Sequence, residues 1–263
     1  MSNLLNKRIL ITGASSGIGE SLAYSLAKAG SIVILVARSE QKLLKIKQEI
    51  EEESSASVYT YAVDITDTYK WMECLQRIID DIGTLDAIIN NAGMGLFEEL
   101  SNMDWNSAQK MIDLNLTALI KTTHFLIPHL DDKEPAHIVN ISSQAGKIAT
   151  PKSSVYSATK FAVIGFSNAL RLELAAKNIY VTTVNIGPVR TNFFNVADPS
   201  GKYKASVDRF MLEPEEVSKK IQESLFTKKR EINLPMWMNM ASTVYQLFPK
   251  LVELLFKKQF NQK

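Results

Sequence analysis

The chain has 263 residues, of which 46% are hydrophobic, so it is long enough to bury a large core in one α/β domain. Its formal charge of +2 gives no reason to expect a nucleic acid as a partner. A single cysteine, Cys74, excludes an intrachain disulfide framework and is typical of a reducing compartment.

The N-terminal run MSNLLNKRILITGA lacks the apolar core and the cleavage site of a signal peptide. No stretch of the sequence reaches the ~18 apolar residues that a membrane-spanning helix needs. We therefore expect a cytoplasmic protein. The three histidines, His124, His129 and His137, lack the paired spacing of a metal site, and we expect no bound metal.

Short apolar, β-branched runs alternate with longer helical patterns along the chain. This alternation predicts right-handed βαβ units and a single Rossmann-type, doubly wound α/β domain over residues 1–234, with a seven-stranded parallel sheet. The predicted strands are 8–12, 32–37, 58–61, 87–89, 137–141, 181–186 and 231–233. The predicted helices are 17–29, 40–53, 67–81, 104–129, 154–177 and 214–226.

The first predicted strand leads directly into the glycine-rich sequence TGASSGIG at residues 12–19. Glycines allow a tight turn and a close approach of the backbone to a pyrophosphate. The N-terminus of the following helix offers free N–H groups and a partial positive charge. The loop therefore predicts a site for the phosphate groups of a nucleotide.

Tyr156 and Lys160 stand four residues apart in the predicted helix 154–177. Side chains at this spacing share a helix face, with Cβ atoms about 5–6 Å apart. A tyrosine has an ordinary pKa of about 10, and positive charge from Lys160 and from an oxidised nicotinamide is expected to lower it. Many helices carry such a pair on their surface, but beside a nucleotide loop the pair indicates hydride-transfer chemistry.

With these motifs and several others, the chain resembles the short-chain dehydrogenase/reductase family over roughly residues 7–233. The loop at 12–19 has the family spacing TGxxxGxG, and the family sequence NNAG stands at residues 90–93, after the fourth predicted strand. Asn115 and Ser143 also stand at the positions that the family uses. Ile186 departs from the proline that the family often has there, which affects only the expected loop geometry.

The resemblance implies catalytic roles for four residues. Tyr156 would be the general acid/base, Ser143 would hold the carbonyl oxygen, Lys160 would bind the nicotinamide ribose, and Asn115 would order a water between Lys160 and solvent. Without the resemblance, Ser142 and Ser143 are typical of a turn, and a mid-helix asparagine usually lies at the surface. The expected cofactor-binding residues are Gly13, Ser15, Ser16, Gly17, Ile18, Gly19, Arg38, Asp64, Asn91, Ala92, Gly93, Tyr156, Lys160, Gly187, Val189 and Thr191.

The end of the second predicted strand distinguishes NAD from NADP. An acidic residue there would bind the ribose 2′-hydroxyl, but this chain reads ARS at residues 37–39. Arg38 could pair with a 2′-phosphate and Ser15 could add a hydroxyl, so we predict NADP. Arg38 is also compatible with a surface cation or with stacking on adenine. The resemblance places Asp64 at the adenine and Thr191 at the nicotinamide carboxamide.

The segment 190–212 corresponds to the substrate lid of the family. Its apolar residues, with those after the fourth predicted strand, favour an apolar pocket for a small, lipophilic carbonyl or alcohol substrate, although they would serve equally in a core. These residues are Phe193, Phe194, Val196, Phe210, Met211, Met94, Leu96 and Phe97.

Residues 235–263 form a C-terminal extension of the domain, for which we expect two amphipathic helices separated by Pro249. We expect the apolar face of the first helix to pack on the body of the protein or on a neighbouring subunit. Membrane-surface contact of 235–260 is the less favoured alternative, because the polar face carries little charge. The apolar face comprises Trp237, Met240, Ala241, Val244 and Phe248, and the polar face comprises Asn239, Ser242, Thr243 and Gln246.

The sequence thus predicts an NADP-dependent oxidoreductase that interconverts a carbonyl and an alcohol. The family commonly associates through helices corresponding to 104–129 and 154–177, so we expect a homodimer or homotetramer. The alternative is a non-catalytic, NADP(H)-sensing regulatory protein on the same fold, which would not need Ser143, Tyr156 and Lys160 together. The fold also supports epimerisation and dehydration.

Overall fold

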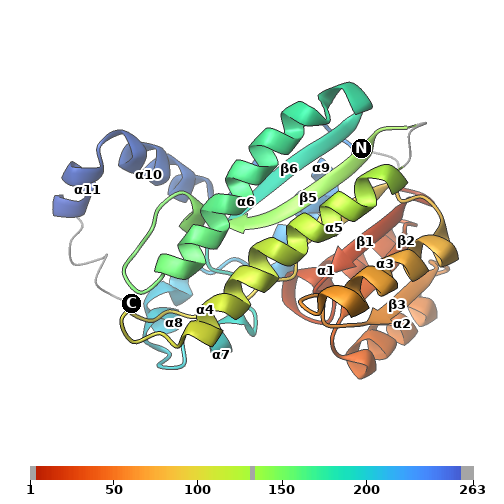
Figure 1. The fold of residues 1–263 in the computed structure, drawn as a ribbon, viewed down its shortest axis with the longest axis horizontal. Helices are drawn as coiled ribbons and strands as arrows, with labels where there is room; N and C mark the ends of the chain where they lie inside the picture. Colours follow the sequence, from red (N-terminus) through yellow and green to blue (C-terminus); the bar gives the residue numbers. More distant parts are fainter. Residues whose placement is uncertain (1–3, 131–133, 256–263) are drawn as a thin grey trace.

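The computed structural model describes residues 4–130 and 134–255. These residues form one seven-stranded sheet with the order β3-β2-β1-β4-β5-β6-β7, in which all neighbouring strands are parallel (Figure 1). The predicted doubly wound α/β fold with seven parallel strands is therefore confirmed. The strands are β1 (Arg8–Thr12), β2 (Ile32–Ala37), β3 (Val58–Ala62), β4 (Ala87–Asn90), β5 (Ala136–Ser143), β6 (Ile179–Ile186) and β7 (Glu231–Leu234).

Helices cover both faces of the sheet, as right-handed crossovers between parallel strands require. One face is covered by α1 (Gly17–Lys28), α2 (Glu40–Glu53) and α9 (Pro214–Ser224). The other is covered by α3 (Thr68–Ile82), α5 (Ala118–Leu126) and α6 (Ser154–Glu173), and Figure 1 shows α5 and α6 side by side in front of the sheet. Six of the helical segments predicted from periodicity thus have a counterpart in the fold.

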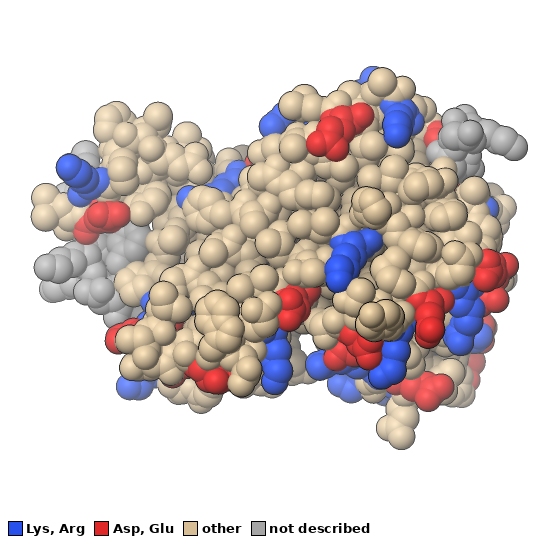
Figure 2. Space-filling model, viewed as in Figure 1, with Lys and Arg blue, Asp and Glu red and all other residues tan. Residues whose placement is uncertain are grey.

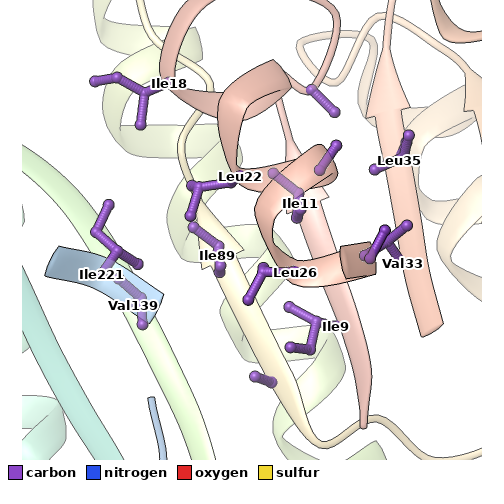
Figure 3. Packing of buried hydrophobic residues seen from close by; sticks show 14 of the residues in the cluster. Ile9, Ile11, Ile18, Leu22, Leu26, Val33, Leu35, Ile89, Val139 and Ile221 are labelled. Atoms are coloured by element: carbon purple, nitrogen blue, oxygen red, sulfur yellow. The ribbon is translucent and has the colours of Figure 1, made fainter. Parts of the chain in front are cut away.

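Two hydrophobic cores result, one on each face of the sheet. Because successive strand residues point to opposite faces, Ile9 and Ile11 of β1 belong to one core and Leu10 belongs to the other. Figure 3 shows the first core, where Leu22 and Leu26 of α1 pack on the strands. All five of these side chains are fully buried.

The predicted helix 104–129 is interrupted in the middle. α4 (Trp105–Ile112) passes into a π-helical turn at Asp113–Thr117 before α5 continues the run to Leu126, and a short 3-10 turn follows at Ile127–His129. The wider turn contains Asn115, whose side chain is buried. Single π-turns within α-helices are frequent at functional sites.

The expected substrate lid contains two short helices, α7 (Phe193–Ala197) and α8 (Lys202–Val207), and a 3-10 turn at Asp208–Phe210. Its two ends are joined at the base, because the Arg190 amide donates to the Leu212 carbonyl and the Leu212 amide donates to the Pro188 carbonyl, both at 2.9 Å. The segment is therefore an excursion from the end of β6 whose two ends are held together by these hydrogen bonds.

Two C-terminal helices, α10 (Met236–Leu247) and α11 (Pro249–Leu255), project from one end of the molecule (Figure 1). Two helices separated near Pro249 were predicted, and the part of that prediction at 256–260 lies outside the described residues. In the described part of the chain, no helix combines the length and the apolar character required to span a bilayer.

The orientation of α10 is the reverse of the expected one. The apolar side chains of Met240 and Val244 are more than half exposed, whereas Ser242 is only 1% exposed. Of the polar side, Asn239 and Ser242 face the body, and Lys147 donates a hydrogen bond to Asn239 Oδ1 at 2.8 Å. Thr243 and Gln246 are exposed.

Of the expected apolar face, Trp237 contacts the body, with its ring centroid 5.5 Å from that of Phe210, but Met240, Val244 and Phe248 are more than half exposed. The expectation that this face packs on the body is therefore wrong for most of its residues, because Lys147 offers a polar partner to the opposite side of the helix.

Candidate active site

The glycine-rich loop connects the end of β1 to the start of α1. Gly13 and Gly17 have φ values of 68° and 58°, in the left-handed region that favours glycine. A Cβ atom at Gly19 would overlap the Gly13 carbonyl oxygen, and one at Gly13 would lie 2.9 Å from Ala92 Cα. The backbone therefore forms a tight cradle that only glycine at these positions permits.

The first turn of α1 opens into this cradle. Ser16 is the N-cap residue and has extended backbone, yet its side chain makes no capping hydrogen bond. The amide groups of the first turn are thus not covered by that side chain, which suits them to an anionic group such as a phosphate. Ser15 is partly exposed in the same loop, while Ile18 is buried beneath it.

The sequence NNAG follows β4 and is bonded to the glycine-rich loop. The Thr12 hydroxyl accepts hydrogen bonds from the amides of Asn91 and Ala92, each at 3.1 Å. The Asn91 side chain donates to the carbonyls of Thr12 at 3.0 Å and Gly13 at 3.2 Å. Thr12 was not among the predicted site residues, although it is the first residue of the TGxxxGxG motif. Its hydroxyl aligns the two predicted segments with each other.

The loop after β6 reaches the same place. A Cβ atom at Gly17 would lie 2.9 Å from Thr191 Cγ2, so Thr191 stands directly beside the glycine-rich loop. Val189 is buried, and Gly187 is enclosed by the start of α10, because a Cβ there would lie 2.9 Å from both Pro235 Cδ and Met238 Sδ. The structure thus brings together these predicted residues from distant parts of the sequence.

Arg38 and Asp64 stand just beyond the carboxyl ends of β2 and β3. Both are exposed. Asp64 accepts hydrogen bonds from the Thr66 amide at 2.9 Å and the Thr66 hydroxyl at 2.7 Å, which fix its carboxylate in a turn. Carboxyl ends of parallel strands are where ligands bind in open α/β sheets, so both residues lie at the edge where a nucleotide would be held.

Ser143, Tyr156 and Lys160 meet at the end of β5. Ser143 is the last residue of that strand; its hydroxyl donates to the Ile186 carbonyl at 3.2 Å and accepts from the Ala145 amide at 3.1 Å. Tyr156 and Lys160 are both buried on α6, and Lys160 Nζ lies 5.8 Å from the centroid of the phenol ring. The predicted triad of side chains therefore exists as one cluster.

Burial determines the proton affinities in this cluster. It raises the pKa of Tyr156 to about 12, while a hydrogen bond with Ser143 acts in the opposite direction. Burial also lowers the pKa of Lys160 to about 8. The lowering expected for the Tyr156 pKa is therefore not found in the protein by itself, because removing the phenol from water disfavours the phenolate. At neutral pH, the phenol carries its proton and Lys160 remains largely charged.

Asn115 connects the NNAG segment to α6. Its Oδ1 accepts from the Met94 amide at 2.8 Å, and its Nδ2 donates to the Met94 carbonyl at 2.8 Å and to Thr159 Oγ1 at 3.1 Å. A Cβ atom at Gly93 would lie 3.2 Å from Asn115 Oδ1 and 3.6 Å from Lys160 Nζ. Gly93 thus lies between the two side chains, and Lys160 Nζ itself donates to a β5 carbonyl at 3.0 Å.

Aromatic rings surround Tyr156. Its ring centroid lies 5.9 Å from that of Phe97 and 5.8 Å from that of Phe193, and Tyr203 adds a ring 5.2 Å from Phe97. Phe194 is also buried and belongs to this cluster. Tyr203 was missed because nothing in the sequence of the segment 190–212 shows which of its residues turn inward. Two predicted pocket residues, Val196 and Phe210, are exposed instead.

No group of three or more metal-ligating side chains occurs within 4–130 and 134–255. The glycine cradle and the first turn of α1 suit the nucleotide predicted from the loop. Cys74 is half-buried in α3, and burial raises the pKa of its thiol to about 11.

Comparison with known proteins identifies the family of the chain. A family model described as short chain dehydrogenase matches residues 7–200. An uncharacterized oxidoreductase of Staphylococcus saprophyticus is 35% identical over 191 residues, which are 73% of this chain and 82% of that protein. An 11-beta-hydroxysteroid dehydrogenase of Pinus massoniana is 30% identical over 97% of this chain and 74% of that protein.

Among solved structures, the L-sorbose reductase of Gluconobacter frateurii, complexed with NADPH and L-sorbose, has a TM-score of 0.78 and 23% identity, with 89% of this chain and 97% of that chain covered. At that identity, the likeness shows the shared fold. The match of the family model, which spans most of the chain, establishes the relationship itself. The chain belongs to the short-chain dehydrogenase family of oxidoreductases.

Proposed function

We propose that this protein is an NADP-dependent oxidoreductase that interconverts a carbonyl and an alcohol on a small, lipophilic molecule. The observation that carries the proposal is the meeting of Ser143, Tyr156 and Lys160 beside a glycine cradle. A protein that only senses a nucleotide needs the cradle but has no use for a buried proton donor next to it. The cluster therefore favours an enzyme over the regulatory alternative.

The residues around the cradle suit a nicotinamide dinucleotide. Backbone amides of Gly17 and its neighbours would hold the pyrophosphate, Asp64 would lie at the adenine, and Lys160 and Thr191 would hold the nicotinamide ribose and carboxamide. When bound, such a cofactor supplies a hydride in reduction or accepts one in oxidation. The remaining chemistry is the transfer of a proton at the substrate oxygen.

Tyr156 would provide that proton. Burial keeps its pKa above the ordinary value, so the phenol is protonated at neutral pH and can donate to a carbonyl oxygen as it gains negative charge. Ser143 would hold the same oxygen through its hydroxyl. In the direction of oxidation, Tyr156 must accept a proton, and the positive charges of Lys160 and of an oxidised nicotinamide would favour the phenolate.

The preference for NADP rests on Arg38. The segment 37–39 carries no carboxylate that would repel a 2′-phosphate, and no ion pair between the exposed Arg38 side chain and a described carboxylate is found. A guanidinium at this place can form a charge-assisted pair with a phosphate. The related fold of L-sorbose reductase is complexed with NADPH, which accords with this assignment.

The aromatic cluster supports a lipophilic substrate. Phe97, Phe193 and Tyr203 surround the phenol with apolar ring surface, and Phe193 packs against Gly95, where a Cβ atom would lie 2.6 Å from its ring. Mostly apolar walls with a few polar groups are typical of small-molecule sites. We therefore expect ketones and aldehydes of apolar compounds to be better substrates than sugars.

The substitution Tyr156→Phe tests the proposal. It removes the hydroxyl and keeps the ring that contacts Phe97 and Phe193, so NADPH binding should be retained while turnover of a panel of lipophilic ketones falls by about 10²–10⁴-fold. Tyr59→Phe, on the exposed side of β3, is the matched control and should change neither. Equal turnover by the Tyr156 variant and the wild type would refute the mechanism. NADPH binding without turnover by the wild type on any substrate would support the sensor instead.

The same surface and composition support two further expectations. Phe161 and Leu172 are exposed on α6, and Figure 2 shows few charges across the face that α5 and α6 form, which suits association into a homodimer or homotetramer. The lone cysteine suits a reducing compartment, so we place the protein in the cytoplasm. Light scattering of the purified chain would test the first expectation.

A further inference from the structure

The two C-terminal helices present an apolar surface to solvent. We define the C-terminal apolar face as seven side chains of residues 236–254, each more than half exposed. In Figure 2, the projecting lobe at the left is mostly uncharged at its surface. A contiguous apolar surface of this kind usually marks a place where something else binds. The seven residues are Met236, Trp237, Met240, Val244, Leu247, Phe248 and Leu254.

A partly buried polar cluster around Lys147 holds α10 in this orientation. Lys147 Nζ donates to Asn239 Oδ1 and Asn233 Oδ1, each at 2.8 Å, and pairs with Glu231 at 2.7 Å. Ser242 lies on the buried side of α10, and its hydroxyl is satisfied within the helix, where it donates to the Asn239 carbonyl at 2.7 Å. If α10 rotated to bury its apolar face, Asn239 would lose Lys147. The outward direction of the apolar side chains is therefore a specified feature of the fold.

The charge of this segment distinguishes between occupants. Residues 235–263 contain four lysines and one glutamate, whereas the remainder of the chain contains 26 basic and 27 acidic residues. Two copies of a cationic segment repel each other when their faces meet, but a negatively charged bilayer attracts both the lysines and the apolar side chains. Trp237, moreover, is an amphipathic ring of the kind that lies at membrane interfaces.

We propose that the C-terminal apolar face binds the surface of an anionic lipid bilayer, with α10 and α11 lying in the plane of the interface. The apolar side chains enter the boundary between headgroups and acyl chains, and the positive charge that four lysines give to the sequence of this segment attracts it to the lipid phosphates. The contact is peripheral, because no described helix could span the bilayer.

This surface adjoins the segment that closes the substrate site. The rings of Trp237 and Phe210 lie 5.5 Å apart, and Phe210 belongs to the excursion between β6 and α9. Met238 and Pro235, at the start of α10, enclose Gly187. Docking would therefore place the substrate segment next to the bilayer, from which a lipophilic carbonyl compound could enter. That last step rests on the proposed function, whereas the docking itself does not.

Co-sedimentation of the full-length protein with sucrose-loaded vesicles tests the proposal. One vesicle preparation is pure phosphatidylcholine and the other contains phosphatidylglycerol as well. The test variant is Met240→Glu/Val244→Glu, and the matched control is Leu44→Glu on α2, because Leu44 and Val244 have the same exposed fraction of 51%. Circular dichroism and NADPH titration establish that both variants are folded.

We expect the wild type and the control to bind phosphatidylglycerol vesicles more tightly than phosphatidylcholine vesicles, with binding weakened by salt. The partition coefficient of the Met240/Val244 variant should fall by about tenfold or more. Absence of wild-type binding to both vesicles would overturn the proposal. The proposal would also be overturned if the wild type formed an oligomer and bound no vesicles, and if the substitutions at Met240 and Val244 broke that oligomer. A second copy of the chain would then occupy the face. None of these results depends on turnover.

Discussion

Helices α1 and α10 are each 12 residues long and both carry an apolar stripe, but they use it in opposite ways. α1 buries Leu22 and Leu26 against the sheet, while α10 buries Ser242 and exposes Met240 and Val244. The difference is in the surface beneath each helix, which is apolar strand for α1 and the polar cluster around Lys147 for α10. Periodicity shows that a helix has two faces, and only the neighbouring surface decides which one is buried.

Replacing one leucine by alanine in each helix should give the largest difference in stability between α1 and α10. Leu26 is fully buried on α1, so Leu26→Ala should lower the free energy of unfolding by about 3–4 kcal/mol through lost burial and a residual cavity. Leu247 is 68% exposed on α10, so Leu247→Ala should change it by less than about 0.5 kcal/mol. Urea denaturation measures both. Equal losses would show that α10 is packed on its apolar side in solution.

Substitution of Lys160, which is buried on α6, measures how much the burial of its amino group lowers stability. Burial lowers its pKa to about 8 in the folded protein, compared with the ordinary lysine value of 10.5. Between these two values the unfolded chain binds more protons than the folded chain, so stability rises with pH in this window. Across this window, Lys160 changes the free energy of unfolding by about 3 kcal/mol. The substitution Lys160→Met should remove this change.

The measurement is urea denaturation of the wild type and the Lys160→Met variant at several pH values between about 7 and 10.5. The free energy of unfolding of the wild type should increase relative to that of the variant as pH increases. If the difference stayed constant, Lys160 would not be buried in its charged form at neutral pH.

Arg38 tests the cofactor side of the molecule. Arg38→Asp removes a charge-assisted pair of about 2 kcal/mol and adds a carboxylate that repels a 2′-phosphate. The ratio of the NADH and NADPH dissociation constants should shift by about thirtyfold in favour of NADH. Fluorescence titration with both nucleotides measures this ratio. Lys42→Asp, an exposed change nearby on α2, is the control, and an equal shift in both variants would mean that net charge alone decides the preference.

The smallest expected effect concerns the polar side of α10. Asn239→Ala removes one hydrogen bond from Lys147, which retains Glu231 and Asn233, so unfolding should become easier by about 1 kcal/mol. Gln246→Ala on the exposed side is the control. Hydrogen exchange of the α10 amides should increase in the Asn239 variant alone. If hydrogen exchange were unchanged, the contact between Lys147 and Asn239 would not explain the orientation of α10.

Much of the architecture followed from the sequence, because the buried strands and the helices that pack on them have simple patterns. The predicted strand 8–12 agrees with β1, and the predicted helix 40–53 agrees with α2. Glycines 13, 17 and 19 indicated the cradle because only glycine tolerates those backbone positions. Where local chemistry and the global fold require the same residue, the sequence is sufficient to predict the structure at that position.

The remaining features depend on contacts between distant segments. The π-turn around Asn115 is not distinguishable from ordinary helix by its composition, and Tyr203 lies in the segment 190–212, which has no periodic pattern. The raised pKa of Tyr156 arises from burial among rings that come from other parts of the chain. The sequence predicted which residues gather at the site, but not how deeply each one is buried.

The contact between Gly17 and Thr191 has a consequence for synthesis of the protein. The glycine-rich loop leaves the ribosome before Thr191, the residue that packs on it, because Thr191 is made only after β6. A nascent chain that stops before this point cannot complete the cradle, however well β1 to β5 have paired. Competence to hold a nucleotide therefore arises only once the segment that follows β6 has been made and has folded back onto the glycine-rich loop.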